Sequence, residues 1–183
     1  MLTSSVIVRA SLTVAVATGV AFAGHSTASA ATSGFRVSIP SAPAGTLPVT
    51  YTCDGQGISP ALKWSNAPRG TKGYAIVMDH VPPDGGHHWY LLHWGIKAKT
   101  RSLSSGPSTV GYLGGNSVNR DIGYAPPCSQ GPGAKTYTIT VYALSGTPTL
   151  PKKSTAAVTR DLLLSAISGI TLSKAVLDVT YSR

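Results

Sequence analysis

Short apolar runs separated by glycine- and proline-rich segments are the feature that most limits how this chain can fold. The 183 residues include 20 glycines and 13 prolines, and the apolar runs between them are five to seven residues long. Runs of that length suit β-strands, whereas helices usually need about ten or more residues. The runs predicted as strands are residues 35–39, 73–78, 89–94, 137–142 and 175–181.

The pattern within each run indicates how a strand is buried. Residues 137–142 alternate between the two faces of a strand, as expected when one face packs on a core. Residues 73–78 and 89–94 are almost continuously apolar, so we expect central strands that are buried on both faces.

Only one segment, residues 156–168, has apolar side chains at helical spacing. Ser154 or Thr155 is the expected helix cap, and Gly169 is the expected end. Several strands followed by one late helix predict a mainly β fold, an antiparallel two-sheet β-sandwich with a C-terminal α-helix.

The first thirty residues have the composition of a secretory signal peptide. Arg9 precedes an apolar run of about 15 residues, and an Ala28-Ser-Ala30 sequence follows it. The alternative is a membrane anchor, but the run is shorter than the roughly 20 residues that span a bilayer. We therefore predict cleavage near Ala30, no stable membrane insertion, and one domain over residues 31–183 that is secreted to the cell envelope or the medium.

Export changes how the two cysteines are interpreted. Cys53 and Cys128 are 75 residues apart, so neither a Cys-x-x-Cys redox motif nor a zinc knuckle can form. Two such cysteines tend to pair in an oxidising compartment. The bridge would contribute roughly 4 kcal/mol by restricting the unfolded chain. We expect a disulfide, with two buried free thiols as the alternative.

Charge composition excludes several functions. All six acidic residues are Asp, and 15 Lys and Arg residues give a net charge of +9. Without Glu, the His-Glu-x-x-His motif of metalloproteases cannot occur. The cations are scattered, with close neighbours only at residues 97–101 and 152–153, so no nucleic-acid-binding stripe is expected. The excess of positive charge favours anions in general.

Histidines concentrate in the segment that includes the third predicted strand, which suggests a metal site first. They are His80, His87, His88 and His93. On a regular strand, however, His88 and His93 would point to opposite faces. No Gly-x-Ser-x-Gly motif is present, and Cys128 has no histidine close in sequence, so no covalent nucleophile is predicted. We expect no metal, no cofactor and no enzymatic activity.

A small anion pocket fits this segment better. His88 and Tyr90 are two residues apart on one predicted strand and therefore share a face. Imidazole, phenol and ammonium groups, together with loop amides, are the donors that bind phosphate. Asp79 would then orient a histidine. Taken alone, His88 is better explained as an ordinary half-buried histidine.

Three sequence blocks together resemble the phosphatidylethanolamine-binding protein family, in particular its bacterial Raf-kinase-inhibitor-like branch. Residues 51–64 open with Tyr-Thr-Cys-Asp-Gly, as that branch does. Asp79-His-Val-Pro-Pro83 stands where the family has Asp-Pro-Asp-x-Pro, and Lys135-Thr-Tyr137 stands where it has His-Arg-Tyr. The resemblance implies two antiparallel sheets with a C-terminal helix, and neither a metal nor a redox cofactor.

Carried over by position, the resemblance implies a ligand pocket formed by Asp79, Pro83, His88 and Tyr137, with Pro126 and Pro127 shaping one wall. Lys135 replaces the family's histidine and keeps a donor for phosphate. His88-Trp-Tyr90 and the following residues to Ile96 resemble the family's histidine-bearing strand. Counting back from Ile96, however, puts Tyr90 at the position of that histidine, so His88 and Tyr90 both remain candidates.

Two functions follow from the sequence. The leading one is a secreted binding protein for a phosphate-bearing or other anionic small ligand, such as a phospholipid headgroup. The candidate ligand-binding residues are Asp79, Pro83, His88, Tyr90, Pro126, Lys135 and Tyr137. The alternative is a protein–protein regulator that inhibits a secreted serine protease or a kinase, suggested by the resemblance and by the polar, exposed-looking segment 106–120.

Overall fold

The computed structural model describes residues 34–183, which form two antiparallel sheets and one α-helix. The strands are β1 (Arg36–Ser38), β2 (Leu62–Ser65), β3 (Gly73–His80), β4 (His88–Lys97), β5 (Ser102–Leu103), β6 (Tyr112–Leu113), β7 (Lys135–Leu144) and β8 (Thr171–Tyr181). The helix is α1 (Arg160–Ile167), and 3-10 turns span Val49–Tyr51 and Ser168–Ile170. The predicted two-sheet sandwich with a late helix is confirmed. The predicted signal peptide, residues 1–30, lies outside the described residues.

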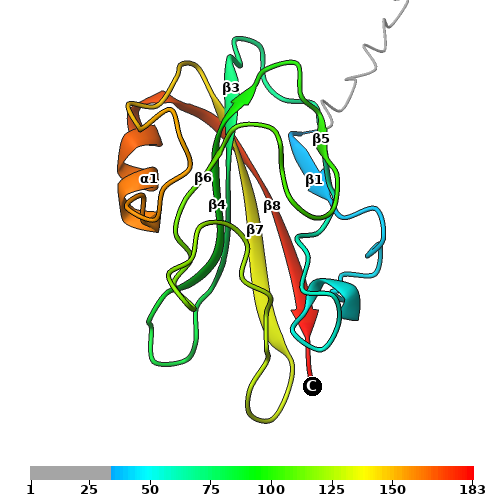
Figure 1. Ribbon diagram of the computed structural model, residues 1–183. Coiled ribbons are helices and arrows are strands. Elements are labelled where there is room, and N and C mark those ends of the chain that lie inside the picture. Colours follow the sequence, from blue (N-terminus) through cyan, green and yellow to red (C-terminus); the bar gives the residue numbers. More distant parts are fainter. Residues whose placement is uncertain (1–33) are drawn as a thin grey trace, which may run out of the picture. The chain divides into compact units, whose positions relative to one another are not determined.

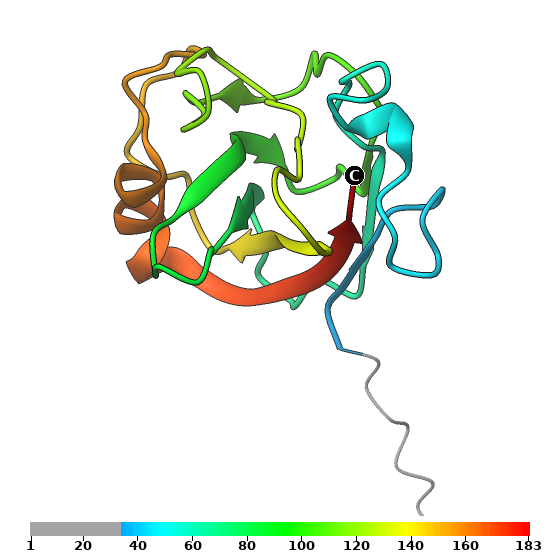
Figure 2. The same ribbon diagram turned by 90° about the horizontal axis from the view of Figure 1, so that it is seen from below.

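The larger sheet forms the middle of three layers (Figure 1). Its strand order is β6-β4-β3-β7-β8, and the smaller sheet has the order β1-β2-β5. The helix α1 covers one face of the larger sheet and the smaller sheet covers the other (Figures 1 and 2). Alternate residues of β3 therefore enter different cores, with Ile76 packing toward the smaller sheet and Val77 toward the helix.

The central strands are buried as predicted, because β3 lies between β4 and β7. The sequence analysis missed β2, β5 and β6, of which β5 and β6 have only two residues each. Segment 106–120, predicted as an exposed loop, contains β6, and several of its residues are buried, Gly106 and Asn116 among them. No helix within residues 34–183 has the length and apolar character needed to cross a membrane.

Strand β4 contains a bulge at Tyr90. Met78 pairs with Leu91 and Asp79 pairs with Trp89, so Tyr90 is left without a partner on β3. An extra residue of this kind reverses the alternation of side chains beyond it. As a result, the consecutive residues Tyr90 and Leu91 both join the core between the two sheets.

The bulge corrects the prediction that His88 and His93 point to opposite faces of β4. That prediction assumed a regular strand, whereas both side chains lie on the face toward the smaller sheet. Residues 34–183 nevertheless contain no group of three or more His, Cys or Asp side chains placed to hold a metal ion.

The helix begins later than predicted. Its cap is Thr159, whose hydroxyl accepts a hydrogen bond from a first-turn amide, and neither Ser154 nor Thr155 caps it. Both of those residues instead bind β6, because the amide of Thr155 donates to Leu113 O at 2.9 Å and Ser154 Oγ accepts from Leu113 N at 3.0 Å. Gly169 lies in the 3-10 turn that follows the helix.

An ion pair joins the start of α1 to the end of β3. Arg160 Nε donates to Asp79 Oδ2 at 2.7 Å, and the two side chains are only 18% and 12% exposed. Asp79 therefore faces the helix and not the smaller sheet. A largely buried carboxylate of this kind depends on its partner, because burial removes the water that would otherwise solvate it.

We expect Arg160→Met to lower the free energy of unfolding by about 2–4 kcal/mol, because it leaves the Asp79 carboxylate buried and unpaired. The double variant Asp79→Asn/Arg160→Met should recover part of this loss. Urea unfolding measures both effects. The control is Asp161→Asn, which changes an adjacent side chain that is 94% exposed. An Arg160→Met loss no larger than that of the control would contradict the role of the ion pair.

Candidate functional site

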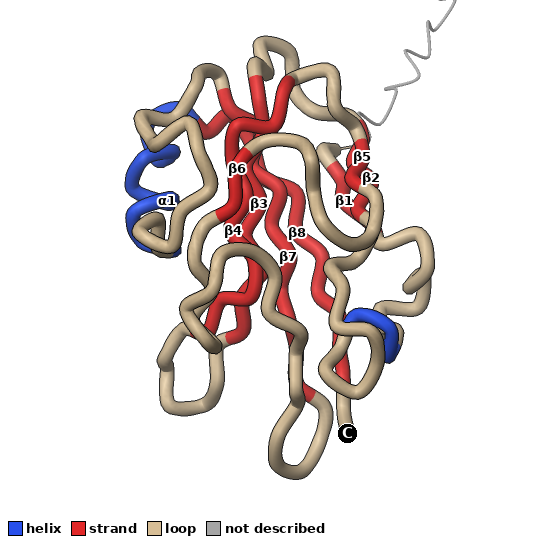
Figure 3. Tube along the Cα trace, viewed as in Figure 1, coloured by secondary structure: helices blue, strands red, loops and turns tan. Residues whose placement is uncertain are grey.

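A cavity of about 440 Å³ lies on the face of the larger sheet that is turned away from the helix. It is formed where β3 ends and where β4 and β7 begin, and Figure 3 shows the loops next to these strand ends at one end of the sheet. Five of the seven predicted ligand-binding residues line this cavity. They are His88, Tyr90, Pro126, Lys135 and Tyr137.

The other two predicted residues, Asp79 and Pro83, do not line the cavity. Side chains alternate along β3, so Asp79 faces Arg160 and the next residue, His80, faces the cavity. Pro82 lines the cavity in place of Pro83. At both places a residue next to the predicted one lines the cavity.

His80 is a cavity residue that the sequence analysis missed, because the family pattern has proline at that position. Its Nδ1 donates to the carbonyl oxygen of Thr136 at 2.7 Å, and its ring lies 5.5 Å from that of Tyr137. The Nε2 atom can therefore donate to a ligand when the ring is protonated. The histidine that Asp79 approaches is instead His87, at 4.0 Å on an exposed loop.

Two tyrosines form the base of the cavity. The rings of Tyr90 and Tyr137 meet edge to face, with centroids 5.2 Å apart and an interplanar angle of 82°. Burial raises the pKa of Tyr90 to about 12, and burial is also the main cause that raises the pKa of Tyr137. Both phenols thus keep their protons at neutral pH. His88 is exposed at the rim, so His88 and Tyr90 occupy different depths of one cavity.

The disulfide predicted from the sequence is present and holds one wall of the cavity. Cys53 and Cys128 are bonded with their Cα atoms 5.3 Å apart, and Cys128 itself lines the cavity. The amide of Cys53 also donates to the carbonyl oxygen of Pro127 at 3.1 Å. Pro127 is buried, whereas Pro126 lines the cavity. The bridge therefore fixes the segment that carries the wall.

Ser129 is a second cavity residue that the sequence analysis missed. It is only 3% exposed and lies beside the Tyr137 phenol, and its backbone and side chain partly offset the rise that burial causes in the pKa of Tyr137. Its Oγ nevertheless meets no partner at hydrogen-bonding distance and angle among the described residues. A buried hydroxyl without a partner is costly, so this atom is available to a ligand. Its position next to Cys128 was the sequence signal that could have identified it.

The polar residues that line this cavity are hydrogen-bond donors or positively charged groups. Lys135 carries a positive charge, His80 and His88 contribute imidazole rings, and the tyrosine and serine hydroxyls can donate hydrogen bonds. No Asp is among the described residues that line the cavity. This set of groups suits a bound anion.

Because Tyr90 is buried, we expect the free energy of unfolding to depend on pH in the alkaline range. Its pKa is raised from the ordinary value of 10.0, so the folded state holds this proton more tightly than the unfolded chain does. The corresponding stability is present below pH 10 and is lost as the pH rises from 10 to about 12. Urea unfolding between pH 8 and pH 12 should show this loss in the native protein and a smaller one in Tyr90→Phe. Equal alkaline losses in the two proteins would contradict the burial of this phenol.

Comparison with known proteins shows which family this chain is similar to. The family model for phosphatidylethanolamine-binding protein matches residues 37–182. A UPF0098 protein of Chlamydia trachomatis is 32% identical over 143 residues, which cover 75% of this chain and 91% of the relative. LppC of Mycobacterium tuberculosis, whose name describes it as a lipoprotein, is 31% identical over 125 residues, or 67% of this chain and 61% of the relative.

Solved structures show the same fold. The crystal structure of a phosphatidylethanolamine-binding protein homologue from Chlamydia trachomatis has a TM-score of 0.73 and 27% identity, and the match covers 82% of this chain and 98% of the homologue. Escherichia coli YbcL has a TM-score of 0.71 at 22% identity, covering 81% of this chain and 98% of YbcL, and agrees in fold. From the family match and the identity to its relatives, this chain belongs to the phosphatidylethanolamine-binding protein family.

Proposed function

We propose that this protein binds a small phosphate-bearing or similarly anionic ligand in the cavity lined by His88, Tyr90, Lys135 and Tyr137, and that it acts by binding rather than by catalysis. One observation carries the proposal. The polar lining consists of groups that donate hydrogen bonds or carry positive charge, and none of its described residues is an acid. A phosphate group needs several such donors converging on a concave site.

The burial of these groups gives the ligand an orientation. Tyr90, Tyr137 and Ser129 are 9%, 1% and 3% exposed and form the base, whereas Lys135 is half-buried and His88 is exposed. Phosphate oxygens at the base would accept from the phenols and from the unpartnered Ser129 hydroxyl. Lys135 would neutralise the charge from the rim, where the rest of the ligand leaves the cavity.

The same lining limits the choice of headgroup. The ammonium of an ethanolamine group would be stabilised by a carboxylate, and no Asp lies among the described lining residues. Asp79, the carboxylate on the adjacent strand end, is engaged by Arg160 on the helix side. We therefore propose recognition of the phosphate itself, without a requirement for the amine that the family's name includes.

We further propose that the protein works outside the cytoplasm. Its Cys53–Cys128 disulfide is typical of oxidising compartments. The N-terminal sequence has the composition of a signal peptide, with cleavage proposed near Ala30. The relative LppC has a name that describes a lipoprotein, which supports a place in the cell envelope.

The alternative function, inhibition of a secreted serine protease or a kinase, has less support. It was suggested partly by an exposed segment 106–120, but Gly106 and Asn116 in that segment are buried and β6 pairs with β4. A panel of secreted serine proteases, assayed with and without the protein, tests this function directly. Slowing of one protease at stoichiometric protein would favour the alternative.

Phosphate binding is tested by NMR titration of the labelled protein with inorganic phosphate at constant ionic strength. We expect shifts at His88 and Tyr137 that saturate in the millimolar range. Lys135→Met removes the one permanent charge of the lining and should weaken binding about tenfold, since hydrogen bonds to charged groups contribute about 1.5–3 kcal/mol.

The matched control is Lys97→Met, an equally conservative change of an exposed lysine at the far end of β4. It should leave the affinity for phosphate unchanged. The proposal fails if no shifts occur at millimolar phosphate, or if the two lysine variants bind phosphate equally well.

A further inference from the structure

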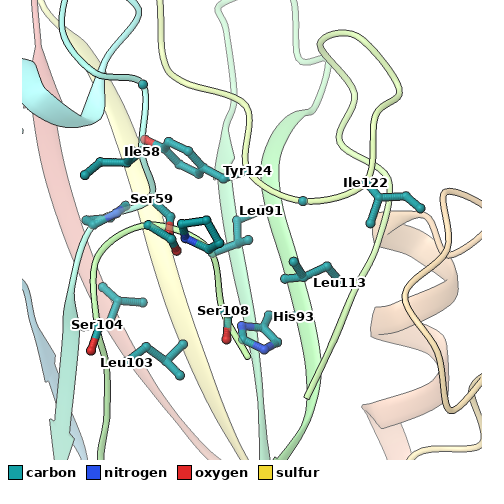
Figure 4. Close-up of a pocket in the computed structure, with 16 residues that line it drawn as sticks. Ile58, Ser59, Leu91, His93, Leu103, Ser104, Ser108, Leu113, Ile122 and Tyr124 are labelled. Carbon is teal, nitrogen blue, oxygen red and sulfur yellow. The ribbon is translucent and has the colours of Figure 1, made fainter. Parts of the chain in front are cut away.

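A second cavity, of about 270 Å³, lies between the edges of the two sheets (Figure 4). Four leucines from four different strands line it: Leu62, Leu91, Leu103 and Leu113. Figure 4 shows Ile58 and Tyr124 at one end and His93 with Ser108 at the other. The mouth is bordered by the exposed residues Ser104 and Ile122, so the cavity has an entrance from solvent.

The two cavities are neighbours but share no lining residue. The bulge on β4 directs Tyr90 into the anion cavity and the next residue, Leu91, into the second cavity. Pro126 and Gly57 form part of the partition, because a Cβ on Gly57 would lie 3.4 Å from Pro126 Cγ. A ligand in the second cavity would therefore contact different residues from those proposed to bind phosphate.

Most polar groups around the second cavity already have partners. Ser59 Oγ donates to the carbonyl oxygen of Gly106 at 2.7 Å, and the Tyr124 hydroxyl donates to the carbonyl oxygen of Tyr51 at 2.6 Å. Ser108 Oγ donates to the carbonyl oxygen of Val110 at 3.1 Å and accepts from the Val110 amide at 3.2 Å. No Lys, Arg or Asp is among the described residues that line this cavity.

His93 is the exception. Its Nε2 donates to the carbonyl oxygen of Val110, so the proton is on Nε2. His93 is 1% exposed, and burial lowers its pKa, which keeps the ring neutral and leaves Nδ1 as a hydrogen-bond acceptor. No hydrogen bond from the described residues reaches Nδ1.

The geometry around the ring shows which way Nδ1 faces. A Cβ on Gly111 would lie 3.0 Å from Nε2 and 3.3 Å from Cδ2 of His93, so this edge of the ring packs against the chain. From this contact, and because His93 lines the cavity, we infer that the opposite edge, which carries Nδ1, faces the cavity. The cavity thus presents largely apolar walls and, on the buried His93 ring, one nitrogen that can accept a hydrogen bond.

We propose that this second cavity binds a small, neutral, mainly apolar molecule that has one hydrogen-bond donor. That donor would bind Nδ1 of His93. Phenol is the simplest probe of that chemistry. The leucine walls would contact the ring, and the hydroxyl would reach the imidazole. An anion is disfavoured because it would meet the lone pair of Nδ1 and no positively charged side chain. The second cavity and the anion cavity would therefore select different kinds of ligand.

The test is an NMR titration of the methyl- and histidine-labelled protein with phenol at pH 7. We expect saturable shifts at the methyl groups of Leu91, Leu103 and Leu113 and at Nδ1 of His93. Anisole has the same ring but no donor and should bind about fivefold or more weakly, since one hydrogen bond contributes about 1 kcal/mol. Phenol should not displace phosphate from the other cavity.

Two variants separate binding from effects on folding. Leu103→Trp fills the cavity from a partly exposed, two-residue edge strand and should abolish phenol binding while phosphate binding persists. His93→Phe should bind phenol and anisole equally, and the carbonyl oxygen of Val110 keeps its bond from Ser108. The control is Leu172→Trp, at an exposed position on β8.

The proposal is overturned if phenol leaves the three leucines unshifted, or if anisole binds the native protein as tightly as phenol does. Unchanged phenol binding in folded Leu103→Trp would also overturn it. Thermal unfolding shows whether each variant is folded. If Leu103→Trp does not fold, the comparison of phenol with anisole on the native protein decides the matter.

Discussion

The bulge at Tyr90 is the constraint on which the binding sites of this protein depend. A regular strand would send Tyr90 and Leu91 to opposite faces, and one of them would face the helix. The extra residue instead places both on the face toward the smaller sheet, where one lines the anion cavity and the other lines the apolar cavity. It also brings His88 and His93 to the same face. Bulges often re-aim side chains next to functional sites, and this one serves two cavities.

Around this strand, the loops that complete the anion cavity are fixed at several points. The Cys53–Cys128 disulfide closes a loop of 75 residues and supports the wall that carries Ser129. Asp54, next to Cys53, accepts hydrogen bonds from Tyr181 and Arg183, which hold its pKa below the usual range. The wall is thereby connected to the C-terminal end of β8, an edge strand of the larger sheet. Such fixing keeps donors in place before a ligand arrives, which reduces the entropy lost on binding.

Much of the fold could be predicted from the sequence, because the long strands follow simple periodicities. The alternation in β7 and the continuous apolar runs of β3 and β4 identified all three, and the isolated cysteines identified the disulfide. Strands β5 and β6 have two residues each, too few for any periodicity. The helix start was misplaced because the β6 edge binds the backbone of Thr155, a tertiary contact that local propensity does not include.

The site was predicted less well than the fold, for a related reason. Five of its seven proposed residues line the cavity. Asp79 was proposed from the family pattern, whereas in the structure it pairs with Arg160 and its neighbour His80 lines the cavity. The sequence could not decide whether Tyr90 or His88 occupies the family's histidine position. Counting residues back from Ile96 crosses a register irregularity in β4 that the sequence does not reveal. Ser129 belongs to no motif beyond its position next to Cys128, and the folded chain shows its hydroxyl to be buried without a partner.

The most direct test of the account is a crystal structure of the protein soaked in phosphate. We expect a phosphate in the cavity formed by β3, β4 and β7, with oxygens within hydrogen-bonding distance of Lys135 Nζ, the Ser129 hydroxyl and the phenol of Tyr90 or Tyr137. We also expect that the leucine-lined cavity holds no phosphate. An empty donor-lined cavity at saturating phosphate, or phosphate held only at scattered surface lysines, would contradict the central claim.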